Sequence, residues 1–255
     1  MQRAQFELHA AIEQRHWWFV ARRQIVQSLV LELLADQPDA LALDVGCGTG
    51  ANAAGLATAL RVEAMDTSSY AIELAREHWT GVTFHHADVL SSEFTLPDGL
   101  AVVLLMDVLE HIEDDVGFLA GLVERLPAGA HLLLTVPANP ALWSRHDEAF
   151  GHHRRYTMQS LEQVWADLPV TVRLMSPYCS ALYPAVWAVR TALKPISGAF
   201  GDADTDFRMP PRPVNSLLRR VFAAERRLLL PLLRGETQRR FPAGSSLIAV
   251  LTKEG

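Results

Sequence analysis

The fold is decided by the stretch Leu43-Asp44-Val45-Gly46-Cys47-Gly48-Thr49-Gly50. It closes a short apolar run at residues 40–45 and is followed at once by a helical pattern at 51–60. A strand, a glycine turn and a helix in this order form nucleotide-cofactor loops, because glycine permits a tight turn and close approach of a ligand. The stretch therefore predicts the start of a nucleotide-binding α/β fold.

Strands and helices alternate along the rest of the chain. Apolar runs predict further strands at residues 61–65, 82–86, 100–106, 131–136, 170–174 and 246–252, with helices at 68–78, 115–126 and 157–168 between them. The run at 100–106 is apolar on both faces, which is typical of a central parallel strand. This alternation predicts a doubly wound, mostly parallel seven-stranded α/β sheet of Rossmann-like type.

Length and composition bound the organisation of the chain. We expect its 255 residues to form a helical cap at 1–39, a core at 40–176, a helical insertion at 177–240 and the last core strand at 241–255. The net charge of −6 does not favour a nucleic-acid partner. Two cysteines, one of them inside the glycine stretch, and the absence of a signal-peptide pattern predict a reducing, cytoplasmic location.

The insertion at 177–240 interrupts the alternation. It contains two helical stretches around a linker at 201–213, and the second stretch has amphipathic spacing with Pro231 as a kink or end. Nine arginines against two glutamates lie between residues 208 and 240. Three interpretations stay open: a lid over the substrate, a helical hairpin packed on the core, and a peripheral contact with an anionic membrane.

Asp44 selects among the cofactors that such a loop can hold. A carboxylate at the strand tip repels a pyrophosphate but suits a cation, and S-adenosylmethionine (SAM) carries an ammonium and a sulfonium. Gly46-x-Gly48-x-x-Ala51 also fits the looser dinucleotide pattern, so an NAD-dependent oxidoreductase is the alternative. SAM is the favoured cofactor because an NAD site would explain neither Asp44 nor Asp88, an acidic residue that follows the strand predicted at 82–86.

These motifs together resemble the class I SAM-dependent methyltransferases, including the quinone-biosynthesis O-methyltransferases. The glycine stretch resembles the first motif of that family, and Met106-Asp107-Val108-Leu109-Glu110-His111 resembles the segment after its fourth strand. The resemblance implies that Asp66 binds the ribose and that Asp88 accepts from the adenine amino group. Asp66 lies 20 residues beyond Gly46, a spacing that suits a ribose ligand. The expected SAM-binding residues in this part of the chain are Asp44, Gly46, Cys47, Gly48, Gly50, Asp66, Thr67, Asp88, Val89 and Met106.

Two further segments resemble a bacterial subgroup of these enzymes. The first is His16-Trp17-Trp18-Phe19-Val20-Ala21-Arg22-Arg23, and the second runs from His146 through His152-His153-Arg154-Arg155-Tyr156. The subgroup resemblance implies that Trp17 and Phe19 close over the methionine end of SAM and that Arg22 or Arg23 pairs with its carboxylate. The alternative is a surface helix whose aromatic residues pack on the core.

A hydroxyl acceptor benefits from a general base, for which the ordinary pKa of histidine is well suited. His111 follows the fourth predicted strand, and His152 and His153 follow the fifth. We assign the catalytic role to these three histidines together with Tyr156, which is positioned to orient the acceptor. His146, Asp147, Glu148, His152 and His153 match no defined metal-binding spacing, so no metal is assigned.

The sequence thus predicts a SAM-dependent methyltransferase that acts on a small molecule, apolar or lipid-like in one interpretation, with oxygen as the favoured acceptor atom. Nitrogen or carbon acceptors, the oxidoreductase, and a non-catalytic SAM-fold module that docks on a membrane or partner remain alternatives. The acceptor molecule and the oligomeric state are left open.

Overall fold

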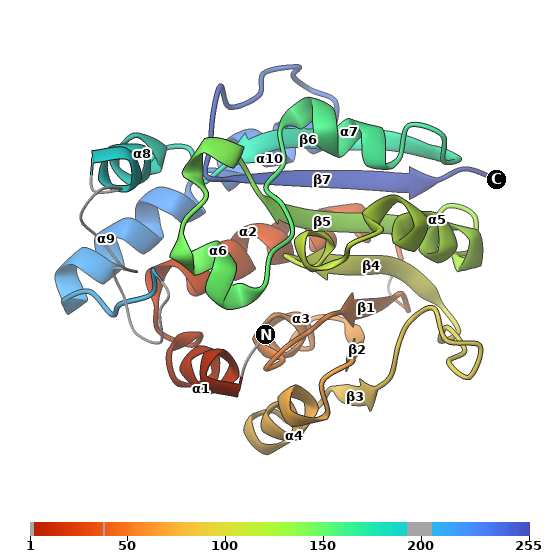
Figure 1. Cartoon of the computed structure of the whole chain (residues 1–255). Coiled ribbons are helices and arrows are strands. Elements are labelled where there is room, and N and C mark those ends of the chain that lie inside the picture. The colour runs from red at the N-terminus through yellow and green to blue at the C-terminus, as the bar shows by residue number, and fades with distance from the viewer. Residues whose placement is uncertain (1–2, 38, 193–205) are drawn as a thin grey trace.

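The computed structural model describes residues 3–37, 39–192 and 206–255, and contains one seven-stranded sheet (Figure 1). The strands are β1 (Leu41–Val45), β2 (Arg61–Asp66), β3 (Thr83–His86), β4 (Leu100–Met106), β5 (His131–Pro137), β6 (Val170–Tyr178) and β7 (Ser246–Lys253). Their order is β3-β2-β1-β4-β5-β7-β6, and only β7 runs antiparallel to its neighbours. The predicted mostly parallel, doubly wound sheet is confirmed.

Helices cover both faces of this sheet. They are α1 (Arg3–Ile12), α2 (Trp17–Leu33), α3 (Ala51–Leu56), α4 (Ser69–His78), α5 (Asp115–Arg125), α6 (Arg145–Phe150), α7 (Met158–Val164), α8 (Tyr183–Ala192), α9 (Arg212–Ala223) and α10 (Arg226–Leu233). One apolar cluster joins the sheet to α2, α3, α4, α9 and α10, and the other joins it to α5 and α7. Every residue of β4 is buried, and from Val102 onward its side chains alternate between the two clusters, as a central strand requires.

Most predicted boundaries lie within one residue of the observed ones, and three ends differ by four residues. One of them is the helix predicted at 157–168, which ends at Val164. The helix predicted at 51–60 ends at Leu56, because the next residues turn toward β2 and Leu60 donates to the carbonyl of Leu56. The sixth strand continues to Tyr178 instead of ending at Leu174, since it pairs with β7 along its whole length. Thr157 caps α7, its hydroxyl accepting from the Ser160 N–H at 3.0 Å.

The insertion between β6 and β7 supplies α8, α9 and α10. Figure 1 shows α8 and α9 at the left of the sheet, the side toward which the arrow of β6 points. α9 packs along α2, while Pro231 lies inside α10. Part of the linker predicted at 201–213 falls outside the described residues. In the described part of the chain, no helix combines the length and apolar character needed to cross a bilayer.

Candidate functional site

A cavity of about 330 Å³ lies where β1 and β4 end. Its walls come from the segment that joins α1 to α2, the glycine loop, the residues after β4 and the loop after β5. α8 and residues 206–208 complete the wall. In a doubly wound sheet, ligands bind at these carboxyl ends of the strands. The cavity therefore lies at the edge of the sheet where a ligand of this fold would bind.

The glycine loop is shaped for close approach of a ligand. Gly46 and Gly48 line the cavity and have positive φ angles of 72° and 55°. A Cβ atom on Gly46 would lie 2.7 Å from Cγ2 of Val108, whereas one on Gly48 would meet no atom within 4 Å. Gly46 therefore lets the loop pack against the residues after β4, and Gly48 leaves its side of the loop open. Cys47 also lines the cavity.

The carboxylate of Asp66 is hydrogen-bonded to this loop. Its Oδ2 accepts from the Gly48 N–H at 2.9 Å and its Oδ1 from the Ser68 N–H at 2.8 Å. The side chain of Ser68, not of Asp66, caps α4 by accepting from the Ala71 N–H. The carboxylate is thus oriented at the edge of the loop, although Asp66 does not line the cavity.

Asp44 lies beneath the loop and is fully buried. Neither of its carboxylate oxygens has a hydrogen-bond partner among the described residues. Burial raises the pKa of Asp44 to about 7, against the opposing effect of the Arg22 guanidinium. An unpaired buried carboxylate behind the loop fits a site that accepts a cationic ligand.

Arg22 forms an ion pair with Asp107 across the cavity. The Arg22 guanidinium carbon also lies 4.4 Å from the ring centroid of Trp18. Burial lowers the pKa of Arg22, while nearby acidic groups oppose that shift. Asp107 holds a positive φ of 59°, and its other oxygen accepts from the Thr135 hydroxyl at 3.0 Å. A cation and an anion are thereby presented side by side, a match for a zwitterionic amino-acid group.

The other residues predicted to bind SAM divide between the cavity and the neighbouring surface. Trp17, Phe19 and Met106 line the cavity. Asp88 is exposed and accepts from the Leu90 N–H at 2.8 Å, so its own turn occupies one oxygen. Besides Asp66, the predicted residues found outside the cavity wall are Asp44, Gly50, Thr67, Asp88 and Val89. Val89 is buried and Thr67 is exposed.

Among the predicted catalytic residues, the structure brings only His111 and His152 to the cavity, with ring centroids 4.8 Å apart. Burial lowers the pKa of His111 to about 3, with a further contribution from His152. His153 is exposed and does not line the cavity. Tyr156 points into the apolar core, where its hydroxyl donates to Oδ2 of Asp115 at 2.6 Å.

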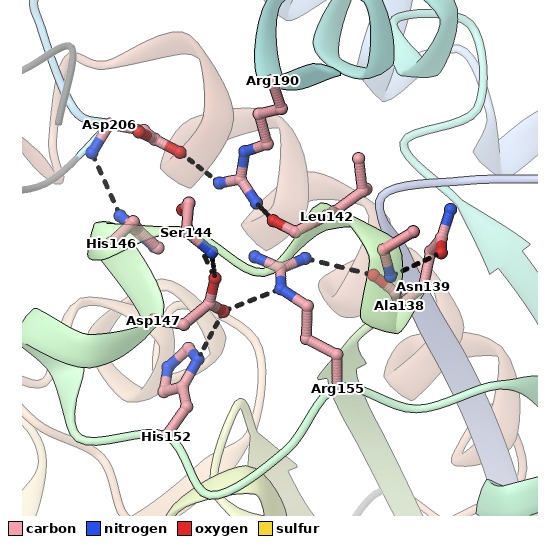
Figure 2. Close-up of polar contacts among 11 residues, drawn as sticks. Ala138, Asn139, Leu142, Ser144, His146, Asp147, His152, Arg155, Arg190 and Asp206 are labelled. Atoms are coloured by element: carbon pink, nitrogen blue, oxygen red, sulfur yellow. Dashed lines mark hydrogen bonds and ion pairs between the residues drawn. The ribbon is translucent and has the colours of Figure 1, made fainter. Parts of the chain in front are cut away.

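Asp147 organises the loop after β5 (Figure 2). Its Oδ1 lies 3.0 Å from Nδ1 of His152 and accepts from Nε of Arg155 at 2.7 Å. Burial opposes ionisation of Asp147, but the bonds from His152 and Arg155 outweigh it and hold the pKa of Asp147 below its usual value. Because a carboxylate only accepts, Nδ1 of His152 carries the proton and Nε2 is left as the acceptor.

A second set of contacts in Figure 2 joins this loop to the insertion. Arg190 of α8 pairs with Asp206 and donates to the Leu142 carbonyl at 2.8 Å. The Asp206 N–H donates to Nδ1 of His146 at 3.0 Å. Burial holds the pKa of His146 well below its usual value, which keeps its ring neutral and able to accept this bond. The insertion is therefore bound directly to the wall of the cavity.

Glu110 lies in the cavity wall, although no sequence pattern assigned it a role. It is fully buried, lines the cavity, and has no hydrogen-bond partner for either carboxylate oxygen in the described part of the chain. Burial raises the pKa of Glu110 to about 8. One ligand atom each from Glu110, His111 and His152 lie within 4.8 Å of one another, close enough to hold a metal ion. A charged residue inside the apolar segment at 108–112 was the signal that could have identified it.

Aromatic rings form the remaining wall. Phe19, Phe150 and Phe207 line the cavity, and the centroids of Phe19 and Phe207 lie 4.8 Å apart. His9 stacks on Phe150 at 5.3 Å, and burial lowers the pKa of His9 to about 3. His9 is therefore neutral near pH 7. A flat, apolar or aromatic molecule suits such a surface.

Comparison with protein families finds a match between residues 18–171 and a methyltransferase domain, more than half of the chain. The mitochondrial ubiquinone biosynthesis O-methyltransferase of Schizosaccharomyces pombe is 35% identical over 101 residues. Those residues are 36% of this chain and 36% of the yeast protein. The chain thus spans little more than a third of the curated relative that it matches.

Solved structures show the same fold at low identity. The plantazolicin methyltransferase BamL, in complex with a triazolic desmethylPZN analog and SAH, aligns with a TM-score of 0.58 and 14% identity, covering 92% of this chain and 86% of its own. A putative methyltransferase solved with the Trm112 activator of Haloferax volcanii has a TM-score of 0.57 and 16% identity over 100% of both chains. A putative sarcosine dimethylglycine methyltransferase from Galdieria sulphuraria has a TM-score of 0.56 and 13% identity, covering 90% and 83%.

Proposed function

Because the chain belongs to the methyltransferase domain family, within the class I SAM-dependent methyltransferases, we propose that it methylates an oxygen atom of a small, largely apolar acceptor. The observation that carries the proposal is the pair of Asp147 and His152, which leaves Nε2 of His152 free beside the cavity. A hydroxyl acceptor must lose its proton as it is methylated, and this nitrogen is the group suited to take it.

The cofactor is SAM, and the residues of the loop fit it. SAM supplies a methyl group on a positively charged sulfur that leaves readily. The unpaired carboxylate of Asp44, the open face of Gly48 and the pair of Arg22 and Asp107 are the features that support binding at this place. Asp66 is proposed to hold the ribose, because two neighbouring hydroxyls both donate well to one carboxylate.

His152 is preferred to His111 as the base for a chemical reason. A base with a pKa of about 3, which His111 has through burial, holds a proton too weakly to remove one from a hydroxyl group efficiently. The carboxylate of Asp147 fixes the tautomer of His152 and leaves its Nε2 as the acceptor. His153 and Tyr156 have no part in the proposed mechanism, since neither lines the cavity.

Oxygen is favoured over nitrogen or carbon by two arguments. A neutral amine is nucleophilic without a base, whereas a hydroxyl group gains much from one. The relative from S. pombe is named as an O-methyltransferase of ubiquinone biosynthesis, which supports oxygen and a ring-shaped acceptor. The wall of Phe19, Phe150 and Phe207 supports the same acceptor class.

The test is release of S-adenosylhomocysteine with a panel of phenols, catechols and matching anilines as acceptors. We expect turnover with the hydroxyl compounds and a kcat roughly 10²- to 10⁴-fold lower for His152→Ala. His153→Ala is the matched control, because His153 is the adjacent histidine and its side chain is exposed. Equal turnover in both variants, or methylation of the anilines alone, contradicts the proposal.

Glu110, His111 and His152 also allow a second mechanism, in which a divalent ion polarises the acceptor oxygen. Extensive dialysis against EDTA separates the two. Unchanged turnover after dialysis supports the general base. Loss of turnover that Mg²⁺ restores would replace the base with a metal ion in the same cavity.

A further inference from the structure

The described part of the insertion carries an exposed apolar surface. Trp187 of α8, Met209, and Val214 and Leu217 of α9 are 48%, 39%, 46% and 61% exposed. They are half of the eight large apolar side chains that are exposed in the described part of the chain, and the other four are spread over separate elements. A concentration of exposed apolar side chains on one short region marks a surface that contacts something apolar.

α9 is held so that this surface faces outward. Its inner side buries Phe222 and presents Asn215, which accepts from the Trp17 N–H and donates to the Arg15 carbonyl, both at 2.8 Å. Val214 and Leu217 are three residues apart, so they lie on one face of the helix, away from Phe222. The packing of α9 on α2 therefore fixes which face is left for a partner.

The same helix pair is strongly basic. Arg212, Arg220 and Arg227 are exposed and form no ion pair with any described residue. Glu225, the acidic residue between them, is buried and accepts from the N–H groups of Ser180 and Ala181. Its charge is thus directed into the protein. Apolar side chains flanked by unpaired arginines match the boundary between acyl chains and anionic headgroups of a bilayer.

This surface is continuous with the wall of the cavity. Val186 and Arg208 line the cavity, and the residues that follow them, Trp187 and Met209, are exposed on the outside. The segments that carry the apolar surface are therefore the segments that close the cavity. An apolar molecule that left a bilayer at this surface would meet the rim of the cavity first.

We infer that residues 187 and 209–227 form a docking surface for an anionic lipid bilayer, beside the point where an apolar acceptor enters the cavity. The contact is peripheral: the apolar face of α9 inserts at the headgroup boundary and the arginines bind lipid phosphates. Docking goes beyond methyl transfer, and its measurement needs neither SAM nor acceptor. A failed docking test therefore does not contradict the proposed methyl transfer, and a failed methyl-transfer test does not contradict the docking.

The experiment is flotation of the full chain with vesicles of phosphatidylcholine alone or mixed with phosphatidylglycerol. We expect binding to the mixed vesicles, weakening with added salt. Arg220→Glu with Arg227→Glu should lower the partition coefficient at least about tenfold, because each basic residue near the surface contributes to binding. Val214→Ser with Leu217→Ser should lower it by a similar factor through lost apolar burial.

Two variants serve as matched controls. Val116→Ser changes a valine of α5 that is 48% exposed, and Arg61→Glu reverses an exposed charge at the start of β2, the end of the sheet opposite to the cavity. Both should bind like the wild type. SAM affinity and thermal unfolding check that every variant is folded.

Three results would overturn the inference. One is equal binding to neutral and anionic vesicles, or binding to neither. Another is flotation of the Arg220→Glu, Arg227→Glu variant to the same extent as the control variant Arg61→Glu. The third is a dimer in light scattering that Val214→Ser with Leu217→Ser dissociates, because the surface would then be covered by a second copy of the chain.

Discussion

The carboxylate of Asp147 holds the imidazole of His152, with 3.0 Å between Oδ1 and Nδ1. Both side chains come from one segment, and α6 begins inside it with Asp147 as the third residue of the helix, which forms a capping box with Ser144. The same carboxylate oxygen accepts from buried Arg155. The orientation of His152 therefore depends on the local fold of the loop and not on the ligand.

Asp147→Asn tests this dependence. The amide presents both a donor and an acceptor, so it no longer selects the tautomer of His152 that leaves Nε2 as the acceptor. We expect kcat to fall about 10²-fold while KM for SAM changes little. Glu148→Gln, an exposed change on the same helix, is the control. Equal kcat in the two variants would remove Asp147 from the mechanism.

Asp66→Ala tests the binding of ribose. The substitution removes the charged partner of the hydroxyl groups and releases the Gly48 N–H, so SAM binding should weaken by about 1–3 kcal/mol in calorimetry. Asp98→Ala, an exposed change before β4, should leave the affinity unaltered. Unchanged affinity in Asp66→Ala would mean that the carboxylate only holds the loop.

The two glycines of the loop should respond differently to alanine. In Gly46→Ala the new methyl group meets Val108 at a positive φ, so the free energy of unfolding should fall by about 1–3 kcal/mol. In Gly48→Ala the methyl group meets no atom within 4 Å, so only the positive φ strains the backbone. The protein should therefore stay folded and lose SAM affinity at least about tenfold. Urea unfolding and calorimetry separate the two effects. SAM binding of wild-type strength in Gly48→Ala contradicts this placement of the cofactor.

The sequence predicts the sheet well because local patterns determine it. The apolar run at 100–106 forms one strand, and the glycines at 46, 48 and 50 form one turn. Both features can be predicted without knowing which distant residues they contact. The choice among the histidines proposed for catalysis needs tertiary information instead. His152 and His153 are adjacent and chemically alike, and only the fold of α6 turns one toward Asp147 and leaves the other exposed.

Burial explains the rest of what the sequence could not give. Asp44 was expected to face the ligand at the tip of the first strand, and it lies fully buried beneath the loop. Glu110 stands in a segment that was recognised, but its unpaired burial is a property of the packed fold. Tyr156 was expected to orient the acceptor, and its hydroxyl lies on Asp115 in the core, because a phenol in an apolar cluster needs a polar partner there.

The buried carboxyl of Asp44 should make the SAM-free protein less stable as pH rises. Its pKa is about 7 in the folded state, raised by burial from the ordinary 3.8. Between these values the folded protein binds more protons than the unfolded chain, so the contribution of Asp44 to stability is greatest below about pH 4 and is lost as pH rises through 7. In Asp44→Asn this loss is absent. The variant should match the wild type near pH 4 and exceed its free energy of unfolding above pH 7.

Burial lowers the pKa of His9 and His16, which act in the opposite sense below pH 6.5, but they are present in both proteins and cancel in the difference. Urea unfolding of both proteins across this range measures the difference directly, and a difference that does not change with pH would mean that Asp44 is ionised and paired in the folded state.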